Sequence, residues 1–200
     1  MRLFFASTVI LICLYGCNNN PNPPINDITD SATVTPVINY AVTKFFPHDT
    51  TLYTEGFLIH DGQLFESTGS PEDRPQTKSV IGIIDLATGT MDKKVEIDKS
   101  KYFGEGIVIL NDKLYQLTYT TQVGFIYDIK SFKQVGKFSF ANKQGWSLTT
   151  NDKEQIMSDG TDKRTVLASV RLIRVNVVPV TENATPVKNL QELEVIKGIL

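Results

Sequence analysis

Two glutamates in matching surroundings are the best candidates for acid–base chemistry in this 200-residue sequence. Glu55 and Glu105 stand fifty residues apart, each is followed by a glycine, and each follows an aromatic residue by two positions, Tyr53 and Phe103. A positioned carboxylate can take a proton from one reacting group and return it to another. A second carboxylate close to Glu105 would raise its pKa. The alternative interpretation is a Glu-Gly turn whose carboxylate is solvated.

The composition argues against a metal centre and against a nucleic-acid partner. The sequence has two histidines, His48 and His60, and two cysteines, Cys13 and Cys17, and none of them lies in a ligand-spaced motif. The formal net charge of −2 is too small to suggest binding to nucleic acid. We therefore expect no metal, no cofactor and no nucleic-acid partner.

The segments that carry the two glutamates repeat a β-hairpin pattern. Residues 56–68 form two apolar-rich runs around His60-Asp61-Gly62, and residues 106–118 repeat the pattern around Asn111-Asp112. Each hairpin is followed by a further predicted strand pair, at residues 79–97 and 124–140. A third unit begins near Gly145.

Units of 40–50 residues with four short strands are typical of β-propeller blades. A β-sandwich also contains short strands at regular spacing, but the internal period favours an all-β propeller. From Tyr40 onward the chain has room for three to four blades, and propellers typically have four or more.

The N-terminal residues are typical of a bacterial lipoprotein. Residues 1–16 read as a signal peptide, whose apolar stretch is too short to span a bilayer. Leu-Tyr-Gly-Cys at 14–17 resembles a lipobox, which predicts cleavage before Cys17 and a lipid on its thiol. Residues 17–39 would then be the lipidated cysteine and a disordered tether. We expect attachment to the membrane through this lipid, in the bacterial cell envelope and facing the periplasm or the exterior. An ordinary secretory signal with an incidental cysteine is the alternative.

Eight short motifs follow one another in the core of the chain: FPHD (46–49), YTEGFL (53–58), LFESTG (64–69), YFGEG (102–106), LYQLTY (114–119), GFIYD (124–128), GWSLTT (145–150) and SDGT (158–161). In this order they resemble the plant-type glutaminyl-peptide cyclotransferase (glutaminyl cyclase) family, and residues 186–198 resume the match. The resemblance implies a five-bladed propeller, truncated at its C-terminus, of which residues 40–200 form roughly the first three to four blades. It also implies conversion of an N-terminal glutamine to pyroglutamate with release of ammonia and without a metal.

The resemblance assigns a role to each candidate site residue. Glu105 matches the catalytic glutamate and would act as the proton shuttle. The residues that match substrate-binding positions are Tyr53, Glu55, Phe103, Tyr119, Trp146 and Gln191. Three of them depart from the family pattern, since Glu55, Tyr119 and Gln191 stand where Gln, Trp and Asn are usual. For Phe103 and Trp146, core packing is the alternative. Three residues of the motifs are interpreted as structural: His48, Asp49 and Glu66.

Two functions stay open at this point. The chain is either a cyclotransferase acting on peptides or proteins with N-terminal glutamine, or a catalytically inactive propeller-like lipoprotein that binds peptides or protein partners. Residues 162–179 keep the family's spacing but lack its Asp-Pro turn, which compensating frameshifts and ordinary divergence explain equally well. An unclosed propeller would also expose strand edges, so a chain that does not fold stably is a third alternative.

Overall fold

The computed structural model describes residues 39–196 and 199–200, and every regular element there is a β-strand. These residues belong to one unit, Val34–Leu200. No helix long and apolar enough to cross a membrane occurs in this part of the chain. The expected signal peptide, Cys17 and nearly all of the expected tether lie outside the described residues, so the domain boundaries and the lipid stay predictions.

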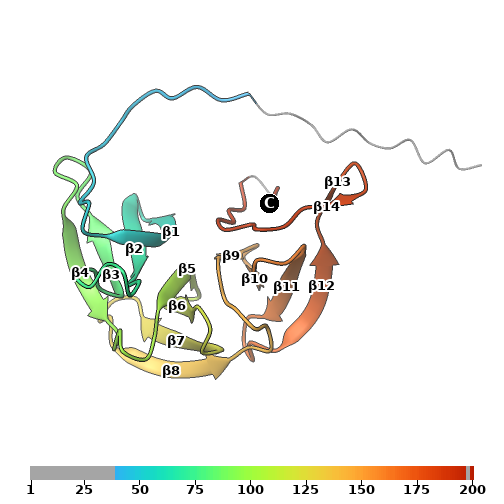
Figure 1. Cartoon of the computed structure of the whole chain (residues 1–200). Helices are drawn as coiled ribbons and strands as arrows, with labels where there is room; N and C mark the ends of the chain where they lie inside the picture. The colour runs from blue at the N-terminus through green and yellow to red at the C-terminus, as the bar shows by residue number, and fades with distance from the viewer. Residues whose placement is uncertain (1–38, 197–198) are drawn as a thin grey trace, which may run out of the picture. The chain divides into compact units, whose positions relative to one another are not determined.

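Three four-stranded antiparallel sheets form the fold, each built from strands that are consecutive in the sequence (Figure 1). The first sheet contains β1 (Tyr53–His60), β2 (Gln63–Gly69), β3 (Val80–Ile84) and β4 (Met91–Glu96). The second contains β5 (Gly104–Leu110), β6 (Lys113–Thr118), β7 (Val123–Asp128) and β8 (Gln134–Ser139). The third contains β9 (Leu148–Thr150), β10 (Glu154–Met157), β11 (Lys163–Ala168) and β12 (Arg174–Pro179). A short pair, β13 (Thr181–Glu182) and β14 (Thr185–Pro186), follows.

Sheets of four sequential strands are propeller blades. The predicted propeller is confirmed, and the β-sandwich alternative is wrong. Residues 162–179 supply β11 and β12 in spite of their unusual composition.

The hairpin turns have the backbone that their residues favour. Asp61 and Gly62 have φ angles of 48° and 73°, and Asn111 and Asp112 have φ angles of 53° and 57°. Two-residue turns with positive φ at both positions match the right-handed twist of the flanking strands. Glycine, asparagine and aspartate adopt this conformation at the lowest cost. The two hairpins predicted from the sequence are therefore confirmed.

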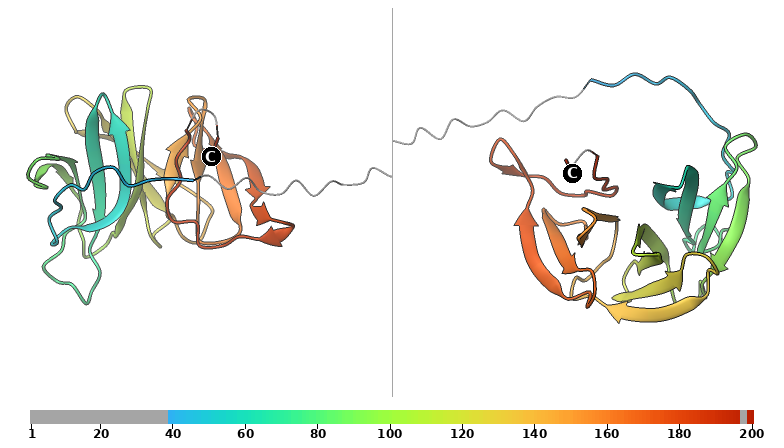
Figure 2. Two further views of the ribbon diagram at one scale, coloured as in Figure 1. Left: turned by 90° about the horizontal axis from the view of Figure 1, so that it is seen from above. Right: turned by 180° about the vertical axis from the view of Figure 1, so that it is seen from behind.

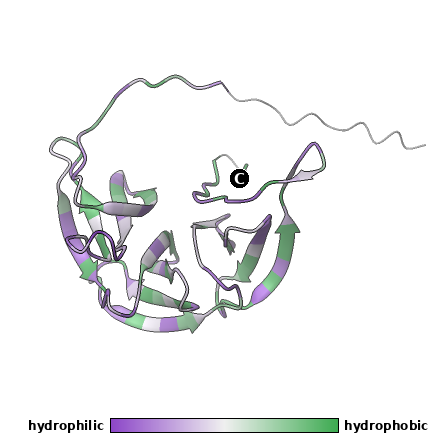
Figure 3. Cartoon of the chain, in the orientation of Figure 1, coloured by the Kyte–Doolittle hydropathy of each residue, from purple (hydrophilic) through white to green (hydrophobic). Residues whose placement is uncertain are grey.

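Alternation of side chains along the strands lets the second sheet, which lies between the other two, bury both of its faces. Ile107 and Leu114 join a buried cluster with the first sheet, whereas Val108 and Tyr115 join one with the third. Successive side chains of a strand point to opposite faces, so neighbouring residues enter different interfaces. Hydrophobic and hydrophilic residues alternate visibly along β8 and β12 (Figure 3). Packing between blades therefore provides the core.

The sheets meet through their first strands, with β1 against β5 and β5 against β9 (Figure 2). The backbones approach so closely that a Cβ atom on Gly106 would lie 2.6 Å from the carbonyl oxygen of Trp146. A Cβ atom on Gly56 would lie 3.0 Å from the Cα atom of Gly106. The amide of Gly106 donates a hydrogen bond to the Trp146 carbonyl at 2.8 Å. Glycine after each of the two glutamates is thus what allows adjacent blades to touch.

Candidate active site

Glu55 and Glu105 occupy equivalent β-bulges in the first strands of two adjacent blades. The β1–β2 register shifts between Thr54 and Gly56, and the β5–β6 register shifts between Gly104 and Ile107. A bulge adds a residue to one strand and changes the direction of its side chain. Both glutamates consequently line one cavity rather than an interface between blades.

This cavity measures about 600 Å³. It contains every residue that the sequence assigned to catalysis or substrate binding: Tyr53, Glu55, Phe103, Glu105, Tyr119, Trp146 and Gln191. They come from all three blades and from the segment after β14. The structure therefore brings the whole predicted set together, while the role of each residue stays a prediction.

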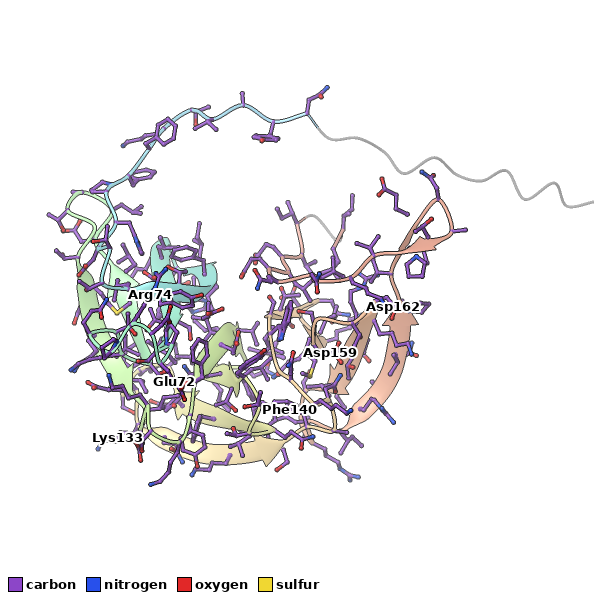
Figure 4. All side chains as sticks on the ribbon, viewed as in Figure 1. Glu72, Arg74, Lys133, Phe140, Asp159 and Asp162 are labelled. Atoms are coloured by element: carbon purple, nitrogen blue, oxygen red, sulfur yellow. The ribbon has the colours of Figure 1, made fainter. Side chains whose placement is uncertain are left out.

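Four further side chains line the cavity and were missed by the sequence analysis: Thr54, Pro71, Glu72 and Glu192. Glu72 lies on the loop between β2 and β3, as does Arg74 (Figure 4). This loop carries no repeated motif that would have singled it out. Glu192 directly follows Gln191, so its position beside a predicted site residue was the available signal.

Aromatic rings form the walls of the cavity. The Phe103 ring lies between those of Tyr53 and Tyr119, with centroid distances of 6.2 Å and 5.9 Å. The indole N–H of Trp146 donates to Oε1 of Gln144 at 3.0 Å, and Nε2 of Gln144 donates to the Tyr119 hydroxyl at 3.2 Å. Gln144 therefore links the side chains of Trp146 and Tyr119 by hydrogen bonds. In ligand sites generally, aromatic walls of this kind exclude water and pack against a small ligand, while precisely placed polar groups orient it.

The carboxyl groups of Glu55 and Glu105 lie in hydrogen-bonding contact. Glu105 is only 6 % exposed, and burial is the main cause that raises its pKa, followed by the charge of Glu55, the hydrogen bond donated to it and the charge of Glu192. Burial also raises the pKa of Glu55, although the hydrogen bond from Glu105 opposes this effect. Two like charges so close in a buried site disfavour joint ionisation. The pair therefore shares a proton at neutral pH.

Glu192 adds a further carboxyl group to the cavity. Desolvation by the surrounding protein raises its pKa to about 7, against the lowering effect of a hydrogen bond from the Phe57 amide. The residue as a whole nevertheless remains exposed. The next amide, that of Leu193, donates to Oγ of Ser147 at 2.8 Å. This second hydrogen bond attaches the segment that carries Gln191 and Glu192 to the start of the third blade.

The residues interpreted as structural lie apart from the lining of the cavity. Glu66 is fully buried and accepts hydrogen bonds from the Thr54 hydroxyl at 2.5 Å and from Nε2 of His48 at 3.0 Å. Asp49 accepts a hydrogen bond from the Thr51 amide at 2.9 Å. Within residues 39–196 and 199–200, no group of three or more His, Cys, Asp or Glu side chains is placed to hold a metal ion.

Comparison with known proteins identifies the family of this chain. A family model described as glutamine cyclotransferase matches residues 8–200. The chain belongs to the glutamine cyclotransferase family. It is 35% identical over 164 residues to the glutaminyl-peptide cyclotransferase of Arabidopsis thaliana, which covers 78% of this chain and 48% of that protein. The family predicted from the sequence motifs is confirmed.

Solved structures place this cyclotransferase family member in the same fold. The crystal structure of Myxococcus xanthus glutaminyl cyclase matches with a TM-score of 0.64 and 25% sequence identity. The match covers 76% of this chain and 62% of that one. The chain thus spans about half the length of the curated relative it matches.

Proposed function

We propose that this protein is a glutaminyl-peptide cyclotransferase, which converts the N-terminal glutamine of peptides or proteins to pyroglutamate and releases ammonia. The observation that carries the proposal is the placement of Glu55 and Glu105 together in one aromatic cavity. Membership of the glutamine cyclotransferase family supports the same reaction.

The reaction needs a group that moves one proton between two nitrogens. The α-amine of the substrate attacks its own side-chain amide carbon, and a C–N bond forms as the ring closes. The attacking amine loses a proton, and the departing amide nitrogen gains one and leaves as ammonia. A carboxyl group within reach of both nitrogens donates its proton to the departing nitrogen and takes up the proton that the amine loses, so the protein is unchanged after each turnover. Glu105 serves as this shuttle.

The remaining residues of the cavity bind and fold the substrate. Because the attack is intramolecular, holding the glutamine in a bent conformation supplies much of the acceleration. The single negative charge shared by Glu55 and Glu105 complements the α-ammonium group of the incoming substrate. Its α-amino pKa of about 8 lies close enough to neutrality for the free amine to form in the cavity. The aromatic walls pack against the side chain, and the Gln191 amide is available to its carbonyl group.

We also propose that the protein is a lipoprotein held in the cell envelope through Cys17, with the domain facing the periplasm or the exterior. Support comes from the lipobox-like residues 14–17 and from the polar, proline-containing segment that follows. Mass spectrometry of the N-terminal peptide from membranes tests this proposal. A Cys17→Ala variant that stays membrane-bound to the same extent would contradict it.

Ammonia release from a short peptide that begins with glutamine tests the proposed activity. We expect release by the 200-residue chain, none by Glu105→Gln, and undiminished release by Glu182→Gln, which changes an exposed carboxyl group on β13. A peptide with its N-terminal amine acetylated should give no ammonia, because the nucleophile is blocked. Absence of turnover by folded parental protein, with peptide binding retained, would refute catalysis and favour a binding protein.

A further inference from the structure

The backbone on either side of Glu105 is held by three successive hydrogen bonds from other parts of the fold. The Gly104 amide donates to Oγ of Ser79 at 3.2 Å. The Glu105 carbonyl accepts the hydroxyl of Ser67 at 2.6 Å. The Gly106 amide donates to the carbonyl of Trp146, at the start of the neighbouring third blade, at 2.8 Å. The bulge that directs the Glu105 side chain is therefore clamped from the first blade and from the third.

Ser67 is the centre of a buried hydrogen-bond chain. Its Oγ also accepts Nε2 of Gln116 at 3.2 Å, and Oε1 of Gln116 accepts the Tyr127 hydroxyl at 3.2 Å. Ser67 and Gln116 are fully buried, and Tyr127 is nearly so. With Gln116 filling an acceptor site on Oγ, the hydroxyl hydrogen of Ser67 is directed at the Glu105 carbonyl. This series of hydrogen bonds thus fixes both the position and the orientation of the Ser67 hydroxyl.

The repeat within the sequence shows that packing alone does not require a hydroxyl here. Fifty residues after Ser67, at the corresponding place in the second blade, stands Leu117, which is equally buried and lies in an apolar cluster. The blade that follows Leu117 presents Trp146 after Gly145, where the blade that follows Ser67 presents Glu105 after Gly104. Ser67 therefore precedes the blade that presents Glu105, and the apolar Leu117 precedes the blade that presents Trp146.

We propose that Ser67 is a positioning residue, whose hydroxyl holds the Glu105 carbonyl so that the Glu105 carboxyl group meets Glu55 and the substrate. This inference rests on the proposed cyclotransferase activity. Ser67 is not among the residues that line the cavity, so we expect its removal to act on the chemical step rather than on binding.

Kinetics of Ser67→Ala in the full chain test this role. Since a misplacement of about 1 Å can cost about 100-fold in rate, we expect kcat to fall by roughly 10- to 100-fold while KM changes less than about 3-fold. The pH dependence of kcat should shift as well, because a relaxed bulge alters the contact between the two carboxyl groups. Ser67→Cys, whose thiol is a weak donor, should recover part of the loss, and it carries the test should the alanine variant fail to fold.

Thr165→Val is the matched control. Thr165, on β11 of the third blade, is also buried, at 2% exposed, and its hydroxyl oxygen accepts a hydrogen bond from Nδ2 of Asn142 at 2.9 Å. This variant should keep the parental kcat and pH profile. Parental kinetics in Ser67→Ala, or an equal loss in Thr165→Val, would overturn the positioning role.

Carboxyl ¹³C NMR separates this inference from the proposed function. The Glu105 signal is assigned by its absence in Glu105→Gln, and its titration should change in Ser67→Ala and not in Thr165→Val. Parental protein without turnover would refute the proposed activity, yet the titration would still report on positioning. A Glu105 titration curve that Ser67→Ala leaves unchanged would refute the positioning role by itself.

Discussion

Replacing Glu105 with glutamine should stabilise the folded protein at neutral pH while abolishing turnover. The pKa of Glu105 in the folded protein lies above its ordinary value of 4.5, mainly because the side chain is buried. As the pH rises above 4.5, the unfolded chain releases this proton and the folded protein retains it, so the free energy of unfolding falls with increasing pH. Glutamine has no proton to release, and its amide can still donate to Glu55.

The expected magnitude follows from the burial of Glu105, which is 6 % exposed. Fully buried carboxyl groups have pKa values raised by up to about 3–5 units. At about 1.4 kcal/mol per unit, the lower end of this range corresponds to about 4 kcal/mol. We therefore expect the free energy of unfolding of Glu105→Gln to exceed that of the parent by about 3–4 kcal/mol at pH 8 and to match it within about 0.5 kcal/mol at pH 4.

Urea unfolding at a series of pH values between 4 and 8 measures this difference. Glu182→Gln serves as the control, since its exposed carboxyl group should leave stability unchanged at every pH. A difference between Glu105→Gln and the parent that does not grow with pH would mean that the Glu105 carboxyl group ionises normally. The shared-proton interpretation of the pair would then be wrong.

Three other changes test the packing and the cavity. Gly106→Ala places a methyl group 2.6 Å from a backbone carbonyl oxygen and should lower the free energy of unfolding by about 1–3 kcal/mol in a urea titration. Gly136→Ala is the control. A methyl group there lies 3.3 Å from the nearest atom, at the end of the Ile126 side chain, and should be tolerated. Met157→Ala removes a fully buried side chain and should cost about 2–5 kcal/mol, against less than about 0.5 kcal/mol for exposed Val135→Ala; equal costs would contradict the assigned core. Trp146 is the single tryptophan and lines the cavity, so a peptide with N-terminal glutamine should alter its fluorescence at saturable concentrations, and an unchanged spectrum on binding would place the ligand elsewhere.

The fold was predictable because its signals are local. Alternation of apolar and polar residues at 106–118 is set by the two-residue period of a strand. The positive φ angles at Asn111 and Asp112 are ones that these side chains tolerate. The recurrence of Glu-Gly after fifty residues revealed the blade repeat. None of these signals depends on how the blades pack.

The site was predictable only in part, and motif resemblance supplied that part. The motifs identified Glu105 and its aromatic neighbours, which the structure places in one cavity. The loop that carries Glu72 has no repeated counterpart. The residue types around Glu192 do not indicate which strands hold its segment, because the hydrogen bond from Leu193 to Ser147 joins residues 46 positions apart.

The sequence by itself determined the strands, their turns, the blade period and the family, since each depends on neighbouring residues or on an ordered set of motifs. Tertiary structure alone decided that Glu55 and Glu105 share a hydrogen bond, that their bulges aim them into the same cavity, and that the hydroxyl of Ser67 holds the Glu105 carbonyl. The physical reason is that the pKa of a carboxyl group and the direction of its side chain depend on atoms from adjacent blades. Those atoms come together only when the innermost strands pack at the distance that Gly56 and Gly106 allow.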